Sequence, residues 1–183
     1  MSDLSKRIAN LSPEKRALLD KRLNEKKNAT SSGKSIPRRK NISPAILSFA
    51  QKRLWFLDQY KSGSHLYNIS VAFRLLGNLN LTALHNAINH IVSRHEALRT
   101  TFTAKNGEPV QVIVLTLKLD LPIIDISDFT EDDRGREIQR LINEEAQKPF
   151  DLSCGPLLRT TLLRLKGDEH VFLLTIHQAS TVY

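Results

Sequence analysis

The residue best suited to chemistry lies near the end of the sequence, at His177. A free imidazole, with a pKa of about 6.5, can exchange a proton near neutral pH and could serve as a general base. The neighbouring Gln178 cannot do so, because an amide has no proton affinity in that range. If both residues lie on a strand, their side chains point to opposite faces, and His177 would then be a hydrogen-bonded residue that lines a site. The sequence leaves both roles open for His177.

A second group of ionisable side chains lies in the middle of the chain, at Arg94, His95, Glu96 and Arg99. Such a group forms either a functional site or a hydrogen-bonded polar network that serves packing. No spacing of Cys and His residues predicts a metal site, so we expect no metal. The single cysteine, Cys154, excludes a disulfide within the chain and is expected to be a small apolar packing residue.

The first element that must position these residues is a helix that follows Ser48. Ser48 as N-cap and Gln51 three positions later match a capping box, and the helix should run to about Tyr60. The spacing of its apolar residues predicts one buried face. That face is expected to contain Ala50, Leu54, Leu57, Trp55 and Phe56.

Periodicity and turn residues predict the other elements. Alternation of apolar and polar residues marks strands, spacings of three and four mark helices, and Asn106-Gly107 suits the tight turn of a hairpin. In chain order we expect a strand over 67–75 with one buried face, a helix over 80–95, hairpin strands over 98–104 and 109–115, an extended piece over 121–126, a helix over 130–148, and strands over 157–165 and 171–176. The last strand is apolar on both faces, which is typical of the middle of a covered sheet. The predicted fold class is α/β, a two-layer arrangement of a mixed sheet with helices.

Charge divides the sequence into a basic N-terminal segment and a neutral body. Residues 1–40 contain 12 Lys and Arg against 4 Asp and Glu, which accounts for the whole net charge of +8. A helix predicted over 13–27 has a narrow apolar stripe and would either dock onto a partner or stay solvated. We therefore divide the chain into a basic helical segment over 1–28, a linker over 29–42 and a folded body over 43–183.

Composition excludes several classes of protein. The body has no net charge and no basic stripe, so we expect no binding to nucleic acid. No apolar run approaches the roughly 20 residues needed to span a bilayer, and the first residues lack the apolar centre of a secretory signal. These features predict a cytoplasmic protein that does not bind membranes.

Two stretches of the body carry a family resemblance. Residues 48–57 match S-x-A-Q-x-R-L-W-x-L, and residues 94–102 match R-H-E-x-L-R-T-x-F. The motif residues are Ser48, Gln51, Arg53 and Trp55 in the first, and Arg94, His95, Glu96 and Arg99 in the second. Together with Tyr67-Asn68-Ile69 between them and residues 150–159 after them, they resemble the condensation domains of nonribosomal peptide synthetases.

The resemblance implies a fold similar to chloramphenicol acetyltransferase, of which this chain would be the N-terminal lobe. Members of this family form amide bonds between aminoacyl or peptidyl thioesters, which carrier proteins present on phosphopantetheine arms. The implied partners are therefore carrier proteins and other synthetase modules, and no cofactor is bound directly. The implied catalytic motif is H-H-x-x-x-D-G, whose second His handles a proton or positions the amine.

The resemblance to that motif breaks after its first position. His177 stands at the first His, whereas the second His falls on Gln178, the Asp on Val182 and the Gly on Tyr183. We therefore expect a truncated condensation domain that is inactive by itself, with apolar surface exposed where a second lobe would pack and with its last strand, 171–176, lacking support on one side. Two alternatives stay open. One is a non-catalytic docking module that binds carrier proteins, and the other is an acyltransferase with a displaced base.

Overall fold

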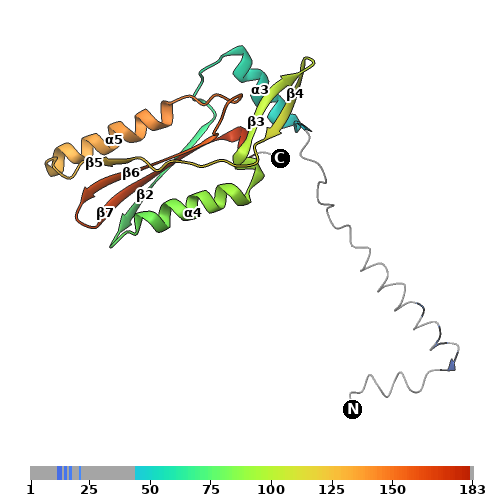
Figure 1. The fold of residues 1–183 in the computed structure, drawn as a ribbon, viewed down its shortest axis with the longest axis horizontal. Helices are drawn as coiled ribbons and strands as arrows, with labels where there is room; N and C mark the ends of the chain where they lie inside the picture. Colours follow the sequence, from blue (N-terminus) through green and yellow to red (C-terminus); the bar gives the residue numbers. More distant parts are fainter. Residues whose placement is uncertain (1–11, 14, 16, 18–20, 22–43, 182–183) are drawn as a thin grey trace. The chain divides into compact units, whose positions relative to one another are not determined.

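The computed structural model describes residues 12, 13, 15, 17, 21 and 44–181. The chain divides into two units, Met1–Asn41 and Ile42–Tyr183, and the fold described below is that of the second unit (Figure 1). Of the helix predicted over 13–27, residues 13, 15, 17 and 21 are described, and each is helical and exposed. The predicted linker over 29–42 lies outside the described residues, as do Val182 and Tyr183.

A mixed four-stranded sheet forms the centre of the second unit. Its strands are β2 (Asn68–Leu76), β7 (Glu169–His177), β6 (Leu158–Lys166) and β5 (Ile123–Asp125), and they lie in the order β2-β7-β6-β5. β5 runs parallel to β6, while the other neighbours are antiparallel. The prediction that the last apolar strand lies in the middle of a sheet is confirmed, because β7 has β2 on one side and β6 on the other. The expectation that this strand lacks support on one side is wrong.

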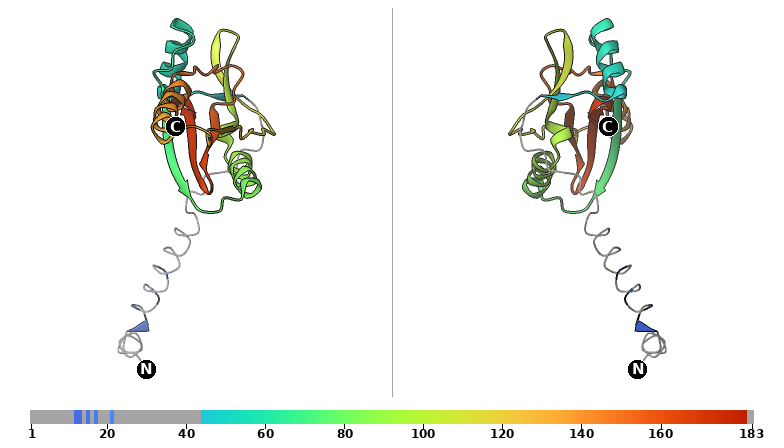
Figure 2. Two further views of the ribbon diagram at one scale, coloured as in Figure 1. Left: turned by 90° about the vertical axis from the view of Figure 1, so that its left-hand side faces the viewer. Right: turned by 90° about the vertical axis from the view of Figure 1, so that its right-hand side faces the viewer.

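One long helix covers each face of this sheet, so the helices and the sheet form three layers and not the two layers expected (Figures 1 and 2). α4 (Leu81–Arg94) is capped by Asn80, and α5 (Glu131–Gln147) is capped by Thr130. Each helix packs its apolar face on a separate core cluster, so both faces of β6 and β7 are buried. The α4 cluster contains Ile88, Val92, Leu119 and Leu158, and the α5 cluster contains Ile126, Leu141, Leu163, Leu165, Val171 and Leu173.

The predicted hairpin forms part of a second, three-stranded sheet. Its order is β1-β4-β3, with β1 at Ala45–Ile46, β4 at Glu108–Ile113 and β3 at Thr100–Lys105. Asn106 and Gly107, between β3 and β4, have φ values of 54° and 82°. Two consecutive positive φ angles are what a type I′ turn requires, so the Asn-Gly prediction is confirmed.

The predicted first helix is α3, Phe49–Tyr60, and it begins with the capping box of Ser48 and Gln51. Its buried face differs from the expected one. Gln51 and Leu54 are buried, whereas Ala50 is exposed and Phe56 is 62% exposed. The side-chain amide of Gln51 can be buried because both its Oε1 and its Nε2 are hydrogen-bonded.

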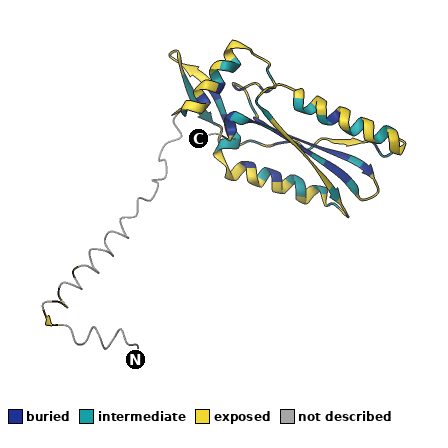
Figure 3. Ribbon diagram, turned by 180° about the vertical axis from the view of Figure 1, so that it is seen from behind, coloured by how far each residue is buried: buried dark blue, intermediate teal, exposed yellow. Residues whose placement is uncertain are grey.

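The prediction of one buried face for β2 is also wrong. Ile69, Val71 and Phe73 are between 41% and 52% exposed, and Figure 3 shows β2 largely in the exposed colour beside the buried β6 and β7. The reason is its place in the sheet, since β2 is an edge strand and the α4 cluster lies over β6 and β7. Cys154 is likewise exposed instead of packed.

Candidate functional site

His177 lies at the end of β7, where it is almost fully buried, with 3% of its surface exposed. Two aromatic rings contact the imidazole edge-on. The ring centroids of Tyr67 and Phe150 are 6.4 and 6.0 Å from that of His177. The pairing of Asn68 with His177 brings the start of β2 to this point, so the Tyr67-Asn68-Ile69 motif and the final histidine meet.

The hydrogen bonding of His177 fixes its protonation. The backbone N–H of Ala179 donates to Nδ1 over 3.2 Å, so Nδ1 is an acceptor and carries no proton. Burial lowers the pKa of His177 to about 4, so the ring is neutral at pH 7 and its proton is on Nε2. Neither nitrogen then has a free lone pair. The geometry supports a hydrogen-bond donor at Nε2 and does not support a general base.

Gln178 is the first residue of the short 3-10 helix Gln178–Ser180. Both main-chain polar groups of Gln178 are hydrogen-bonded. Its N–H donates to the carbonyl of Tyr67 over 2.9 Å, and its carbonyl accepts from both the N–H and the hydroxyl of Thr181. The loop after β7 is therefore held by backbone contacts, while the side chain at position 178 is an amide with no capacity for proton transfer.

The first sequence motif supports this loop from the other side. The side-chain Nε2 of Gln51 donates to the carbonyl of Ala179, and its Oε1 accepts from Gln111 and from the N–H of Ser48. Trp55 packs against a third core cluster, which contains Phe150 and Ala179, whereas Arg53 is exposed. Gln51 is thus hydrogen-bonded to the loop after His177, and Trp55 supports the same region by apolar packing.

The segment over 150–159 supports the same region. The guanidinium of Arg159 lies 3.7 Å over the ring of Phe150 and pairs with Glu145 of α5 at 2.6 Å. From β2, the side-chain amide of Asn68 donates to two carbonyls at the end of α5, those of Ala146 and Lys148. Both contacts tie the end of α5 to the strands beside His177. In the sequence, only the resemblance to family motifs indicated Asn68, Phe150 and Arg159. No sequence pattern predicted that they contact the end of α5.

The second motif forms a separate structure. Arg99 donates to the carbonyls of Val92, Val114 and Leu115, so it ties the end of α4 to the segment after β4. Arg94, His95 and Glu96 are exposed at the end of α4. None of these hydrogen-bond partners, within residues 44–181, belongs to the loop that follows His177. The predicted site residues therefore do not all lie in one site.

A small cavity of about 120 Å³ lies beside His177. Its polar groups include the carboxyl of Asp58, whose pKa is raised mainly by burial and next by the negative charge of Asp151. The cavity is lined by Leu57, Asp58, Tyr60, Lys61, Ser64, Leu66, Tyr67 and His177. Sequence analysis identified Tyr67 and His177 but no other member of this lining.

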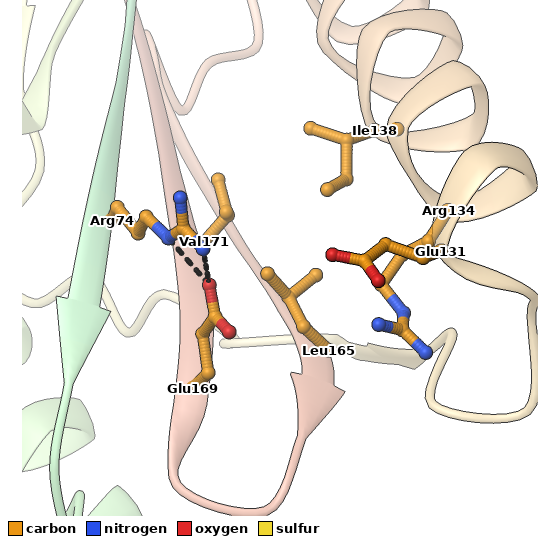
Figure 4. Close-up of a pocket in the computed structure, with 8 residues that line it drawn as sticks. Arg74, Glu131, Arg134, Ile138, Leu165, Glu169 and Val171 are labelled. Atoms are coloured by element: carbon orange, nitrogen blue, oxygen red, sulfur yellow. Dashed lines mark hydrogen bonds and ion pairs between the residues drawn. The ribbon is translucent and has the colours of Figure 1, made fainter.

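A larger hollow of about 330 Å³ lies near the far end of β7 (Figure 4). Its arginines already have partners within the chain. Arg74 pairs with Glu169, and Arg134 donates to the carbonyls of Ile126, Ser127 and Phe129. Arg74 is therefore engaged by a carboxylate, and Arg134 is engaged by three main-chain carbonyls of its own chain.

Two absences concern the described part of the chain. Within it, no group of three or more His, Cys, Asp or Glu side chains is arranged to hold a metal ion. No helix in the same residues is both long and apolar enough to cross a membrane.

Comparison with known proteins identifies the family. The family model "Condensation domain" matches residues 42–179, which is most of the chain. The chain belongs to the condensation domain family. The resemblance carried by the motifs at 48–57 and 94–102 is thereby confirmed.

Curated relatives of this condensation-domain chain are large synthetases. It is 44% identical over 178 residues to phosphinothricin tripeptide synthetase PhsC of Streptomyces viridochromogenes, covering 97% of this chain and 16% of that protein. It is 52% identical over 131 residues to a linear gramicidin synthase of Brevibacillus parabrevis, covering 72% of this chain and 2% of that protein. The chain thus spans only a small part of the relatives that it matches.

Solved condensation domains share the fold. The starter condensation domain of rhizomide synthetase RzmA superposes with a TM-score of 0.68 at 23% identity, covering 75% of this chain and 34% of that one. The first condensation domain of the CDA synthetase gives a TM-score of 0.66 at 21% identity, covering 75% and 36%. The predicted α/β fold of a condensation domain is confirmed, and about a third of each of these structures is matched.

Proposed function

We propose that residues 42–179 act as the N-terminal part of a nonribosomal peptide synthetase condensation domain and do not catalyse condensation by themselves. The hydrogen bond from the Ala179 N–H to Nδ1 of His177 is the observation that carries this proposal. Because of this bond, His177, the only histidine at the positions of the H-H-x-x-x-D-G motif, can act only as a hydrogen-bond donor through Nε2. The next residue, Gln178, has an amide side chain.

The proposed parent reaction joins an amine to a thioester. The amine nitrogen attacks the thioester carbonyl, a C–N bond forms, the C–S bond breaks, the amine loses a proton and the thiolate gains one. A proton acceptor beside the amine assists this sequence. Neutral His177 with Nδ1 occupied and Gln178 supply none, so the chain supports the site structurally, through the Gln51 and Tyr67 contacts with the loop after β7.

The relatives' names guide the proposed substrates and partners. A tripeptide synthetase and a gramicidin synthase both make peptides, so we assign aminoacyl or peptidyl groups on phosphopantetheine arms as substrates of the whole domain. Carrier proteins and neighbouring synthetase modules are the corresponding partners. The absence of a directly bound cofactor and a cytoplasmic location stay predictions.

An amide-formation assay tests the proposed lack of catalysis. Purified chain would be mixed with an aminoacyl carrier protein as acceptor and a peptidyl carrier protein as donor, and products would be measured by mass spectrometry against a complete condensation domain from a relative. We expect no product above the rate without protein for the chain or for Gln178→His. Product formation by the unmodified chain that disappears in His177→Ala would overturn the proposal and favour the displaced-base alternative.

A docking module that binds carrier proteins is the second candidate. The alignment with the tripeptide synthetase covers 97% of the chain and so includes most of the basic segment over 1–40. Titration of labelled carrier protein with the purified chain, followed by NMR, would measure binding. Lys15→Glu/Lys21→Glu reverses charge at two exposed helical positions and should weaken binding if the segment takes part. No binding at the highest attainable concentration would exclude this candidate.

A further inference from the structure

Asn68 and Arg159 flank His177 on one face of the four-stranded sheet. Residues that pair directly in an antiparallel ladder place their side chains on the same face. Asn68 of β2 pairs with His177, and Arg159 of β6 pairs with Thr175, two residues earlier on β7. Leu173 of β7 lies on this face too, because side chains alternate along a strand, and it belongs to the α5 cluster. The side chains of Asn68, Arg159 and His177 therefore project from the face that α5 covers.

Asn68 and Arg159 share one hydrogen-bond acceptor, the carbonyl of Lys148. Nδ2 of Asn68 and Nη2 of Arg159 each donate to it over 2.8 Å. Lys148 is the C-cap residue of α5, where the last carbonyls of a helix have no partner within the helix. The further acceptors of the same two side chains are the main-chain carbonyls of Glu145, Ala146 and Pro149. Strands β2 and β6 thus cap the C-terminal end of α5 together.

Phe150 connects this cap to His177. It follows the capped Lys148 by two residues and is buried. The guanidinium of Arg159 lies 3.7 Å from the centroid of the Phe150 ring, as in a cation–π contact, and the same ring meets the imidazole of His177 edge-on at 6.0 Å. One arginine therefore binds both the main chain that leads to Phe150 and the ring itself. A change at Arg159 can reach His177 through Phe150.

We propose that Asn68 and Arg159 are positioning residues, which together cap the end of α5 and thereby hold Phe150 against the imidazole of His177. Their effect on the imidazole passes through the carbonyl of Lys148 and the ring of Phe150. Phe150 and His177 are both buried, so their contact does not depend on what lies over the exposed surfaces of the chain. The role concerns the surroundings of the imidazole and is independent of whether the chain catalyses condensation.

The ionisation of His177 reports on this contact. Burial lowers the pKa of His177 to about 4, and Phe150 is one of the two aromatic rings that contact it. If the cap is lost and water reaches the imidazole, its pKa should rise toward the ordinary value of about 6.5. The charged groups of this region are Asp58 and Lys61 in the adjoining cavity, Asp151 near Asp58, and the pair of Glu145 and Arg159. A variant of Arg159 must therefore keep its positive charge, so that an effect of position can be separated from an effect of charge.

NMR titration of the full chain with isotope-labelled histidines tests the proposal, and His177→Asn identifies the signal of His177. Arg159→Lys keeps the charge but lacks the planar fork that reaches several carbonyls at once, and Asn68→Ala changes no charge. Each should raise the protonation constant of His177 at least about tenfold. Arg164→Lys makes the same exchange elsewhere on β6, in the pair with Asp125, and should leave the constant unchanged. Circular dichroism shows whether each variant keeps the wild-type fold.

Two further measurements test the route through Phe150. Phe150→Leu removes the aromatic ring and should itself raise the protonation constant of His177. Adding Arg159→Lys to Phe150→Leu should then raise the constant little further, because residues that act through one contact are not additive. In the unmodified chain, nuclear Overhauser contacts should join the ring protons of Phe150 and His177, and this measurement needs no variant.

Four results would overturn the proposal. The first is the absence of contacts between the two rings in the unmodified chain. The second is a protonation constant of His177 that stays within about twofold of wild type in both Asn68→Ala and Arg159→Lys. The third is an effect of Arg159→Ala that Arg159→Lys does not share, which would assign the role to charge. The fourth is full additivity of Arg159→Lys and Phe150→Leu, which would mean that Arg159 acts on His177 by another route.

Discussion

Gln51 and Ala179 lie 128 residues apart in the sequence, and Nε2 of Gln51 donates a 3.3 Å hydrogen bond to the carbonyl of Ala179. Both residues are buried, and the same amide also accepts from Ser48 and Gln111. One side chain thus joins the start of α3, strand β4 and the loop that follows His177. These contacts explain why the first motif has a glutamine at position 51.

Replacing this amide should destabilise the fold. Gln51→Ala leaves the carbonyl of Ala179 without its partner and removes buried contacts, so we expect the free energy of unfolding in urea to fall by about 1–3 kcal/mol. Gln59→Ala, on the same helix but exposed, is the matched control and should change it by less than about 0.5 kcal/mol. Equal effects of the two substitutions would contradict a specific role for Gln51.

Stability should decrease in acid because of His177. Burial lowers its pKa to about 4 in the folded chain, against about 6.5 when unfolded. The unfolded chain binds the proton more tightly, so the contribution of the neutral ring is complete above about pH 6.5 and is lost as the pH falls toward 4.

We expect this residue to account for about 1–2 kcal/mol of the stability lost between about pH 7 and pH 4.5. His177→Asn keeps an acceptor for Ala179 but does not titrate, so its urea-unfolding free energy should vary less with pH. His90→Asn changes an exposed histidine and should keep the wild-type pH profile. Identical profiles for His177→Asn and the wild type would refute the assignment.

Arg159 should matter more than the other ion-paired arginine of β6. It lies on Phe150, pairs with Glu145 and donates to carbonyls at the end of α5, so Arg159→Ala should cost about 1–3 kcal/mol in thermal or urea unfolding. Arg164 pairs with Asp125 at the surface, and Arg164→Ala should cost less than about 1 kcal/mol. A larger effect at Arg164 would count against the proposed support of the His177 region.

Gly155 should tolerate no side chain, because its φ is +61° and an added Cβ would lie 3.0 Å from Cγ2 of Thr101. We expect Gly155→Ala to cost about 1–3 kcal/mol. Gly167→Ala has a similar φ of +55° but meets no atom within 4 Å, so it should cost less. Thr101→Ser removes the methyl group and should recover part of the loss in a double-mutant cycle. No recovery would show that backbone strain alone is responsible.

Local patterns predicted the elements well. The cap at Ser48 and the turn at Asn106-Gly107 each depend on residues within three or four positions, and both were confirmed. Such signals are visible in one sequence because donor and acceptor are neighbours in it.

Burial and site geometry could not be predicted in the same way. Alternation showed that β2 has an apolar face, but whether a helix covers it depends on where α4 lies. Likewise, the tautomer of His177 depends on Ala179, and the support of that loop depends on Gln51 and Arg159. These contacts join segments that are distant in the sequence. The motifs marked His177, Gln51 and Arg159 as family residues but did not indicate which residues they contact.

The pairing of β2 with β7 also determines when the chain can fold. Asn68 pairs with His177, so the central strand of the sheet leaves the ribosome long after its edge neighbour. Contacts of such large sequence separation form slowly, because a long loop must close before they are made. Until then β2 has exposed apolar side chains and unpaired main-chain groups along both edges. Newly made chains therefore pass through an aggregation-prone interval that a chaperone could shorten or protect.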